Sequence, residues 1–589
     1  MEYGRAVFPN SCTPGLSILH RPCFFLTIHF LAAVVLHSTA LGQSADDQEL
    51  ASDSFFASSA VPLDSWVYPA FDRLAALGDA PSALDGMRPW TRLQCARLAL
   101  EAKQSLESEA DTADPDALAI ADELVREFSY EIAMLHGSRN RSAGITSVYT
   151  RATEIAGPPL RDAFHFGQTI YDDFGRPYGQ GFNSISGTQL HAEYGPIAVA
   201  VRGEFQDSRA LFPYNQTALN AIAAQDQLPV MPLPGISALD RMRPVEASFS
   251  LKLLGWQATF GEQSQWWGNS RTNSLILSNN AEAPVVLLIQ RDRPFELPGL
   301  FAYLGKLNNT FFIGQLRGQH FVRGPYPNFV LEGTPAHTLN PQPFIWGEHL
   351  DIKMSPDLEL GFEISCMWAG YGRPATVRTW LHTFSFHGSY QALDPGKRYG
   401  GFHAAWRLPG MRDVTLYWDA MANDEPTPLI YETRSAMNPG IYFSHLPRFR
   451  QTDLRVEGLY TNIPNYADGV GAVYWNGHYA DGYRNAGQLI GSWVGRAGTG
   501  IVAQSTYWFK GVDRIDVSMR RQFNDIHMIG GGGLTDFSAH SFYQLHGSWQ
   551  LDGSVTAERW HFPILKSGSP NVVTAAIGIT FTPPYQRRK

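Results

Sequence analysis

The side chains best suited to catalysis in this 589-residue sequence are its 18 histidines, and their spacing matches no common catalytic or metal-binding motif. No H-x-x-x-H or H-E-x-x-H places two imidazoles on one helix face, and no C-x-x-C pair offers thiolates. No G-x-S-x-G nucleophile elbow occurs either. A lipase-type triad needs only Ser, His and Asn from separate strands, so Ser444-His445 and His387 stay open as members. Histidines in the interior or at the ends of a membrane-spanning sheet explain the same residues more simply.

Cysteine use also argues against a bound metal. Cys12 and Cys23 lie in a predicted leader, which leaves Cys95 in a predicted helix and Cys366 in a predicted strand. Two such thiols form neither a disulfide framework nor a metal site, and we expect them to be buried or lipid-facing apolar groups. The sequence therefore predicts a protein that is not an enzyme and that needs neither metal nor cofactor.

A different chemistry is offered by aromatic and amide side chains gathered in two polar stretches. Aromatic faces pack against the C–H groups of sugars, while amides and charged side chains hydrogen-bond the hydroxyls, so this composition favours a saccharide. The candidate carbohydrate-binding residues are Trp266, Trp267, Asn269, Arg271, Asn279, Asn280, Tyr474, Trp475, Asn476, His478 and Tyr483. An aromatic belt at a membrane interface is the competing explanation for any one of the tryptophans.

The elements that must position these residues are mostly strands whose outer solvent is not water. Charged residues make up 17% of the chain, below the roughly 25% typical of soluble domains. Beyond residue 143 the hydrophobic period is two. In E-L-G-F-E-I-S-C-M-W, one face carries Leu360, Phe362 and Ile364, whereas Glu359 and Glu363 lie on the other. This alternation, repeated across the chain, indicates a sheet with one apolar and one wet face.

Such a sheet can span a lipid bilayer only if it closes, because every backbone N–H and C=O needs a partner inside the protein. At about 24 residues per strand with its connection, residues 143–582 give roughly 18 strands. We therefore predict a mainly β protein built on a large antiparallel transmembrane β-barrel, with short turns at one end and long loops, such as 207–245 and 323–349, at the other. Its lumen is water-filled or plugged, since a ring this wide exceeds the reach of its own side chains. A soluble sandwich or propeller is the alternative.

In such a barrel the pair Trp266-Trp267 has an unusual setting, since no aliphatic residue neighbours it. Adjacent strand residues point to opposite faces, so at most one of the two rings can join a membrane belt. We expect the pair to close a strand near the barrel rim. One ring would pack in the membrane interface or against the lumen wall, and the other could stack on sugar.

The N-terminal segments are expected to direct the chain out of the cytoplasm and to fill one end of the barrel. Residues 1–42 predict a cleaved signal peptide, because Arg21 precedes an apolar run that ends in small residues. An uncleaved anchor is the alternative, which His29 and His37 within the run disfavour. An acidic, Ser-rich spacer follows at 43–61, and a basic tail occupies 583–589. The net charge of −9 is spread along the chain, with no basic block to attract nucleic acid.

Between the spacer and the strands, residues 62–142 predict a small bundle of three α-helices that plugs or covers the periplasmic end of the barrel. Asp64 is the expected N-cap of the first helix and Gly78 its stop. The second helix is expected to start near Pro89-Trp90. The third has Asp114 as N-cap and Pro115 at its first position, and runs to Gly137.

Several stretches resemble the capsule assembly proteins of the Wzi type. The segment 261–291, which begins G-E-Q-S-Q-W-W-G-N-S-R-T-N-S-L-I-L-S-N-N-A, resembles the family's W-W-G signature, and 398–428, 440–462 and 482–498 match further along in the same order. Residues 61–78 are like the family's helical N-terminal unit. Two features depart from it: Asn269-Ser270 stands where Pro-Gly is common, and Phe581 must anchor the last strand because a short tail follows.

This resemblance implies an outer-membrane barrel with a periplasmic helical bundle and extracellular loops. It implies a lectin-like protein that tethers capsular or extracellular polysaccharide to the surface of a Gram-negative-type bacterium. Its partners would be that polysaccharide, outer-membrane lipid and capsule export machinery. The sequence leaves two other functions open, a porin-like channel for a small polar solute gated by the helices, and a barrel hydrolase using His445.

Overall fold

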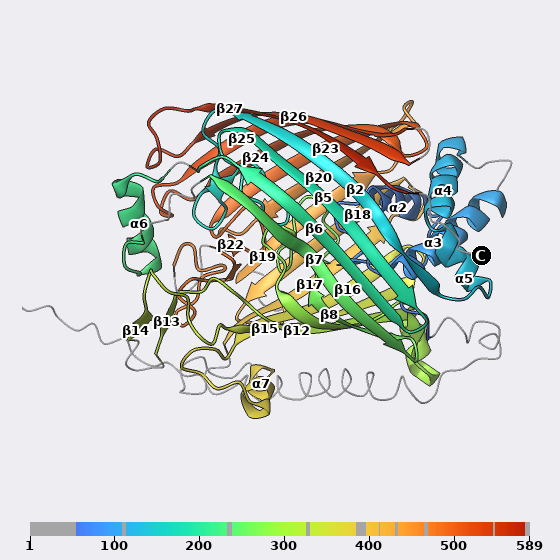
Figure 1. Cartoon of the computed structure of the whole chain (residues 1–589), viewed down its shortest axis with the longest axis horizontal. Coiled ribbons are helices and arrows are strands. Elements are labelled where there is room, and N and C mark those ends of the chain that lie inside the picture. The colour runs from blue at the N-terminus through green and yellow to red at the C-terminus, as the bar shows by residue number, and fades with distance from the viewer. Residues whose placement is uncertain are drawn as a thin grey trace, which may run out of the picture.

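The computed structural model describes residues 55–583 apart from 109–113, 212, 232–237, 325–329, 385–395, 412, 430–433, 464–468 and 546–547. Within them the chain forms a closed antiparallel barrel of 18 strands (Figure 1), which confirms the predicted fold class. The first barrel strand closes the ring by pairing with both the second and the last. The strands are β2 (Arg141–Ala156), β5 (Gly181–Tyr194), β6 (Ile197–Ser208), β7 (Leu239–Leu253), β8 (Trp256–Glu262), β10 (Val285–Arg291), β12 (Lys306–Gln315), β15 (Phe344–Ser355), β16 (Leu358–Trp368), β17 (Lys397–Arg407), β18 (Val414–Asn423), β19 (Ser435–Phe443), β20 (Thr452–Tyr460), β23 (Gly498–Lys510), β24 (Asp513–Asn524), β25 (Gly532–Gln544), β26 (Trp549–His561) and β27 (Asn571–Phe581).

The barrel wall has an apolar outside and a polar inside, the reverse of a soluble domain. On β16, Phe362 is exposed, whereas Glu359 and Glu363 on the opposite face are buried. An apolar outer face of this kind is suited to lipid. Of the two predicted alternatives, a water-filled or a plugged lumen, the structure shows a lumen that is largely plugged, because other parts of the chain pack against many inward charges. Cys366 on β16 and Cys95 are buried free thiols, as expected.

The two ends of the barrel differ, as the predicted alternation of short turns and long loops requires. At one end, called the helix end below, neighbouring strands are joined by turns such as 254–255 and 356–357. The opposite end, called the loop end, carries long connections with α6 (Gln216–Asp226) and α7 (Val377–Thr383). Two predicted loops are shorter than expected, because α6 and the start of β7 occupy part of 207–245 and β15 begins within 323–349.

Short elements complete the loops. They are β1 (Met87–Arg88), β3 (Arg161–Asp162), β4 (Gly167–Gln168), β9 (Trp266–Trp267), β11 (Phe295–Glu296), β13 (Phe321–Arg323), β14 (Leu331–Gly333), β21 (Arg484–Asn485), β22 (Gln488–Leu489) and the 3-10 helix η3 (Gly299–Leu304).

Four short helices form the N-terminal unit: α2 (Val67–Leu77), α3 (Arg92–Ser108), α4 (Pro115–Glu127) and α5 (Ser129–Leu135). Asp114 caps α4 as predicted, its side chain accepting the Asp116 N–H at 2.9 Å, and Gly78 ends α2 with a φ of 99°. Asp64 does not cap α2, which was a wrong prediction: its carboxylate instead pairs with Arg202 on β6 at 2.7 Å. The predicted third helix is divided at Phe128 into α4 and α5.

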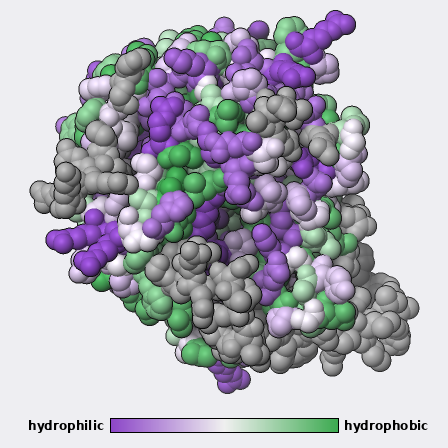
Figure 2. Space-filling model, turned by 90° about the vertical axis from the view of Figure 1, so that its right-hand side faces the viewer, coloured by the Kyte–Doolittle hydropathy of each residue, from purple (hydrophilic) through white to green (hydrophobic). Residues whose placement is uncertain are grey.

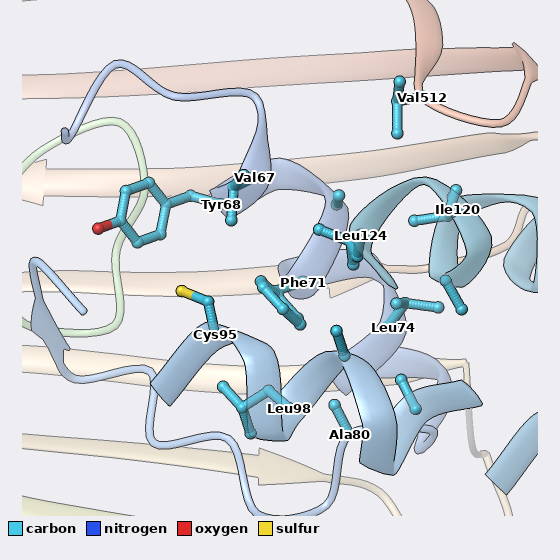
Figure 3. Packing of buried hydrophobic residues seen from close by; sticks show 14 of the residues in the cluster. Val67, Tyr68, Phe71, Leu74, Ala80, Cys95, Leu98, Ile120, Leu124 and Val512 are labelled. Atoms are coloured by element: carbon cyan, nitrogen blue, oxygen red, sulfur yellow. The ribbon is translucent and has the colours of Figure 1, made fainter. Parts of the chain in front are cut away.

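The helices pack on one apolar core, shown in Figure 3, in which Phe71, Leu74 and Leu124 converge. Val512, from the turn between β23 and β24, joins the same core, so the helical unit is attached to the barrel by apolar contact. Among the described residues, no helix combines the length and the apolar character that crossing a membrane requires.

The helical unit closes one end of the barrel and reaches into the lumen. Its strand β1 pairs with β9, so that Met87 lies opposite Trp267 and Arg88 opposite Trp266. Arg73 on α2 donates to the Arg450 carbonyl at 2.9 Å. Figure 2 views this end, where hydrophilic residues predominate around a central hollow.

Candidate functional site

The two aromatic and amide segments singled out in the sequence meet inside the barrel. The Tyr474 hydroxyl donates to the Leu275 carbonyl at 2.6 Å, and the Asn280 amide donates to the Leu489 carbonyl at 3.2 Å. The Ser278 N–H donates to the Ile490 carbonyl at 2.9 Å. Segments 199 to 212 residues apart in sequence therefore meet in one folded layer inside the lumen.

Trp266 and Trp267 are both buried in that layer, so neither ring lies in a membrane belt. The Trp266 indole N–H donates to the Ser270 carbonyl at 2.9 Å. The Trp267 ring packs edge-on against Phe312 and His349 of the barrel wall, with centroids 5.5 and 5.2 Å away. The expected position near the rim is thus corrected, because pairing with β1 draws the pair deep into the lumen. Their role here is to join the helical unit to the wall.

The residues that follow the tryptophans bind inward-facing carboxylates. Glu457 on β20 accepts hydrogen bonds from Ser270 Oγ at 2.5 Å and from the Arg271 N–H at 2.9 Å. Asp419 on β18 accepts the N–H of Asn269 at 2.8 Å. Arg271 Nε lies 3.0 Å from Asp72 Oδ2 on α2, so this segment connects the helices to two barrel strands.

The buried tyrosines form the centre of the luminal layer. Tyr399, on the barrel wall, lies 4.7 Å from Tyr483 and 6.0 Å from Tyr474 between ring centroids. The Tyr483 hydroxyl lies 2.9 Å from Ser365 Oγ on β16. Tyr474 and Tyr483 are fully buried and Asn279 and Asn280 nearly so, which makes all four part of the plug rather than an open binding face.

Of the second stretch, Trp475 and Asn476 stay partly exposed at the loop end. The Asn476 side-chain oxygen accepts the N–H groups of His478 and Tyr479, both at 2.9 Å, and so fixes the turn that presents Trp475. Arg373 donates to His478 Nε2 at 2.6 Å, and Tyr371 beside it in sequence is 39% exposed. Burial, and next the Arg373 guanidinium, lowers the pKa of His478 to about 3, so the ring is neutral at pH 7.

Comparison with known proteins connects this architecture to a family. The model of the capsule assembly protein Wzi family matches residues 150–575. The chain belongs to the Wzi family. No curated protein matches the sequence.

Among solved structures, the chain is similar to the Escherichia coli protein described as Wzi, an outer membrane protein involved in group 1 capsule assembly and a carbohydrate-binding β-barrel. The TM-score is 0.62 at 15% identity, covering 89% of this chain and 99% of that one. Pseudomonas aeruginosa OpdQ matches with a TM-score of 0.39 at 11% identity, covering 75% of this chain and 98% of its own. Acinetobacter baumannii OccAB1 has the same TM-score and identity, with 75% and 96% covered.

In this Wzi-family chain a charged network, which the sequence analysis missed, secures α6 over the loop end. His165 lies between Asp162 at 2.7 Å and Asp226 at 2.8 Å, and Arg496 pairs with Asp226. Burial alone would lower the pKa of His165, but the two carboxylates outweigh it and raise that pKa. The same imidazolium and Arg496 hold the pKa of Asp226 below its usual value despite burial. This network could not be found from the sequence, because Asp226 and Arg496 lie far from His165 along the chain and no recognisable motif relates them.

A polar cavity of about 360 Å³ remains between the helical unit and the wall. Its lining includes Arg151, Arg202, Arg514, His540 and Asp552. On β27, Gly578 lies beside the lining residue Asp552 and has no side chain of its own, which leaves room here. The cavity is the feature of the described residues that best fits a channel.

The candidate hydrolase residues do not form a triad. His445 lies at the helix end with Nε2 3.0 Å from Asp114 and Nδ1 3.4 Å from Asp413. The Ser444 hydroxyl donates to the Asp413 carbonyl at 3.4 Å rather than to the imidazole. His387 lies outside the described residues.

Proposed function

We propose that this Wzi-family chain is an outer-membrane, carbohydrate-binding protein that holds capsular or extracellular polysaccharide at the cell surface. One observation carries the proposal most directly: the segments 263–284 and 471–497, which would have to leave the lumen clear in an open pore, instead pack into it with most of their residues buried. For this function the loop end of the barrel would face the outside of the cell. The helical unit would face the periplasm and the machinery that exports the polymer. The relative described as carbohydrate-binding supports the same ligand class.

Within the loop end, the partly exposed Trp475 and Asn476, with Tyr371 and Arg373 nearby, are the best candidates for direct contact with sugar. They combine aromatic faces with amide and guanidinium donors, the groups that sugars bind. Trp266, Trp267, Asn269, Arg271, Asn279, Asn280, Tyr474, His478 and Tyr483 would act indirectly, by fixing the layer beneath. Each contact is weak, and retention would arise because one polymer offers repeated epitopes to many barrels.

Deletion of the gene in its host tests this function. Polymer should be synthesised in unchanged amount but appear in the medium instead of on the cells, because its anchor is lost. Full surface retention in the deletion strain would overturn the proposal. Complementation with Trp475→Ala, compared with Trp406→Ala on the lipid-facing side of β17, would separate sugar contact from the general loss of an aromatic ring.

A channel for a small polar solute is the second candidate, and the cavity of about 360 Å³ beside the helices favours it. If the protein is a channel, the full-length chain should conduct ions in planar bilayers. If it is a tether with a plugged lumen, the full-length chain should conduct few ions.

A further inference from the structure

Inside the barrel wall, one group of side chains has the donors and spacing of a metal site. Among the described residues only His349, Asp351 and His403 bring three ligand atoms within 4.8 Å of one another. His349 Nε2 lies 2.8 Å and His403 Nε2 3.0 Å from the same oxygen, Asp351 Oδ1. All three side chains are buried. They take no part in the sugar-binding surface, which lies at the loop end.

The strand register explains how these residues meet. His349 and Asp351 are two apart on β15, so both point into the lumen. Gly361 on β16 pairs with Asp351 on one side and with His403 of β17 on the other. A side chain at Gly361 would overlap the His403 ring, so the glycine provides the gap across which the imidazole reaches the carboxylate.

A second carboxylate orients the His403 ring as in many metal sites. His403 Nδ1 lies 2.7 Å from Glu363 Oε1, so Nδ1 carries the proton and donates. In a neutral imidazole the Nε2 lone pair then points at the Asp351 oxygen, 3.0 Å away, where two lone pairs would repel each other. Either a second proton on His403 or a metal ion bound at Nε2 removes that conflict, and a carboxylate that binds the far nitrogen is the usual support for a histidine ligand.

His349 shows a complementary gap. Its Nε2 faces Asp351, while its buried Nδ1 has no hydrogen-bond partner among the described residues and lies 4.0 Å from Glu363 Oε1. Buried polar atoms are rarely left without a partner. An ion bound at Nε2 would place the proton on Nδ1, which could then donate to Glu363 after a small movement.

The charges of the cluster also favour a bound cation. With neutral imidazoles, the carboxylates of Asp351, Glu359 and Glu363 face one contacting ammonium, that of Lys353, 3.4 Å from Glu359. A divalent cation would balance the two remaining negative charges, whereas a proton on His403 would balance only one of them, and uncompensated charge is costly to bury.

We propose that His349, Asp351 and His403 bind one divalent transition-metal ion of the zinc class, for which two imidazoles and a carboxylate are suitable ligands. Glu359 is the nearest candidate for a fourth ligand, its Oε1 being 4.0 Å from His403 Nε2. The same carboxylate accepts the backbone N–H groups of Asp85 and Gly86 at 3.0 and 2.9 Å. The ion would therefore secure the helical unit's inserted loop against strands β15 and β17.

Elemental analysis of the folded, detergent-extracted full chain tests this site. We expect about one equivalent of zinc-class metal in the wild type and in His445→Gln, whose histidine also lies between two carboxylates but outside the cluster. Asp351→Asn and His403→Gln should retain less than about a tenth of that metal, since a ligand is lost. Equal metal content in all four proteins would overturn the proposal.

Refolding provides a second readout that does not depend on the variants' yield. Wild-type chain refolded with Co²⁺ should show the visible absorption of cobalt bound by nitrogen and oxygen ligands, and should resist proteolysis within residues 82–90 better than chain refolded with EDTA. Absence of both bound metal after extraction and a cobalt band after refolding would rule the site out. Neither result depends on polysaccharide binding.

Discussion

Arg271 shows at the scale of one residue how the lumen is sealed. Its guanidinium lies 3.0 Å from Asp72 and 3.4 Å from Asp85 of the helical unit, while its backbone N–H binds Glu457 on the wall. The side chain is therefore shared between two helical-unit carboxylates in a largely buried place. An arginine that the sequence suggests for sugar binding serves here as a connector, because its partners come from segments almost 200 residues away.

Replacing Arg271 by alanine should destabilise the docked helical unit by about 2 kcal/mol, because Asp72 and Asp85 lose one cation and keep Arg88, which pairs with Asp72 and lies 3.8 Å from Asp85. The measurement is the urea concentration at which half of the helical unit is released, monitored by proteolysis within residues 62–137. The control Arg559→Ala removes an exposed arginine from β26 and should change this midpoint little. Equal midpoints for Arg271→Ala and wild type would contradict the assigned role.

The network around His165 should make α6 sensitive to pH. The raised pKa of His165 gives stability that is complete below about pH 6.5 and is lost as pH rises through the folded-state value. The lowered pKa of Asp226 gives stability that is complete above about pH 4 and is lost as pH falls further. Protection of α6 amides from hydrogen exchange, corrected for intrinsic rates, should be greatest between these limits. His165→Gln should remove the loss on the alkaline side; an unchanged profile would refute the assignment.

At the scale of elements, the small pair β1 and β9 joins the helical unit to the barrel. Gly268 follows β9 with a φ of 107°. The next two residues, Asn269 and Ser270, donate their backbone N–H groups to the Asp419 carboxylate. A Cβ at this position would lie 2.8 Å from Asp419 Oδ2. The turn therefore depends both on a left-handed backbone and on the absence of a side chain.

Gly268→Ala should cost about 2 kcal/mol in docking of the helical unit, since it adds a contact with Asp419 to the backbone strain. Gly410→Ala is the matched control, because Gly410 also has a positive φ, of 85°, but open space around it. The control should lose about 1 kcal/mol. Chemical denaturation of both variants measures the difference, and a larger loss in the control would contradict this account.

The elements that the sequence predicted well are those whose signal is local. Alternation predicted the lipid-facing and luminal sides of β16, and Asp114 with Pro115 predicted the start of α4. Asp64 was misassigned because a carboxylate before a helix can either cap it or pair with a distant arginine. The inward course of 263–284 could not be foreseen, since Asn- and Ser-rich segments suit both open loops and buried, hydrogen-bonded ones. Only the partners Glu457 and Asp419, on distant strands, decide between them.

At the scale of the whole molecule, two layers occupy the barrel: the helical unit at one end and the inward loops toward the other. Full-length protein should therefore conduct little in planar bilayers. Removing residues 62–137 should raise conductance only modestly, because the segments 157–180, 263–284 and 471–497 still fill the lumen. A large, steady conductance of the full chain would favour the channel instead.

Retention of polymer by the loop end is the central claim, and affinity electrophoresis of the folded protein in gels containing the host's extracellular polysaccharide tests it most directly. We predict that the wild type and Trp406→Ala are retarded, whereas Trp475→Ala loses about fivefold to tenfold in apparent affinity, the effect of one aromatic stacking contact. Equal mobility of the wild type with and without polysaccharide would contradict the account.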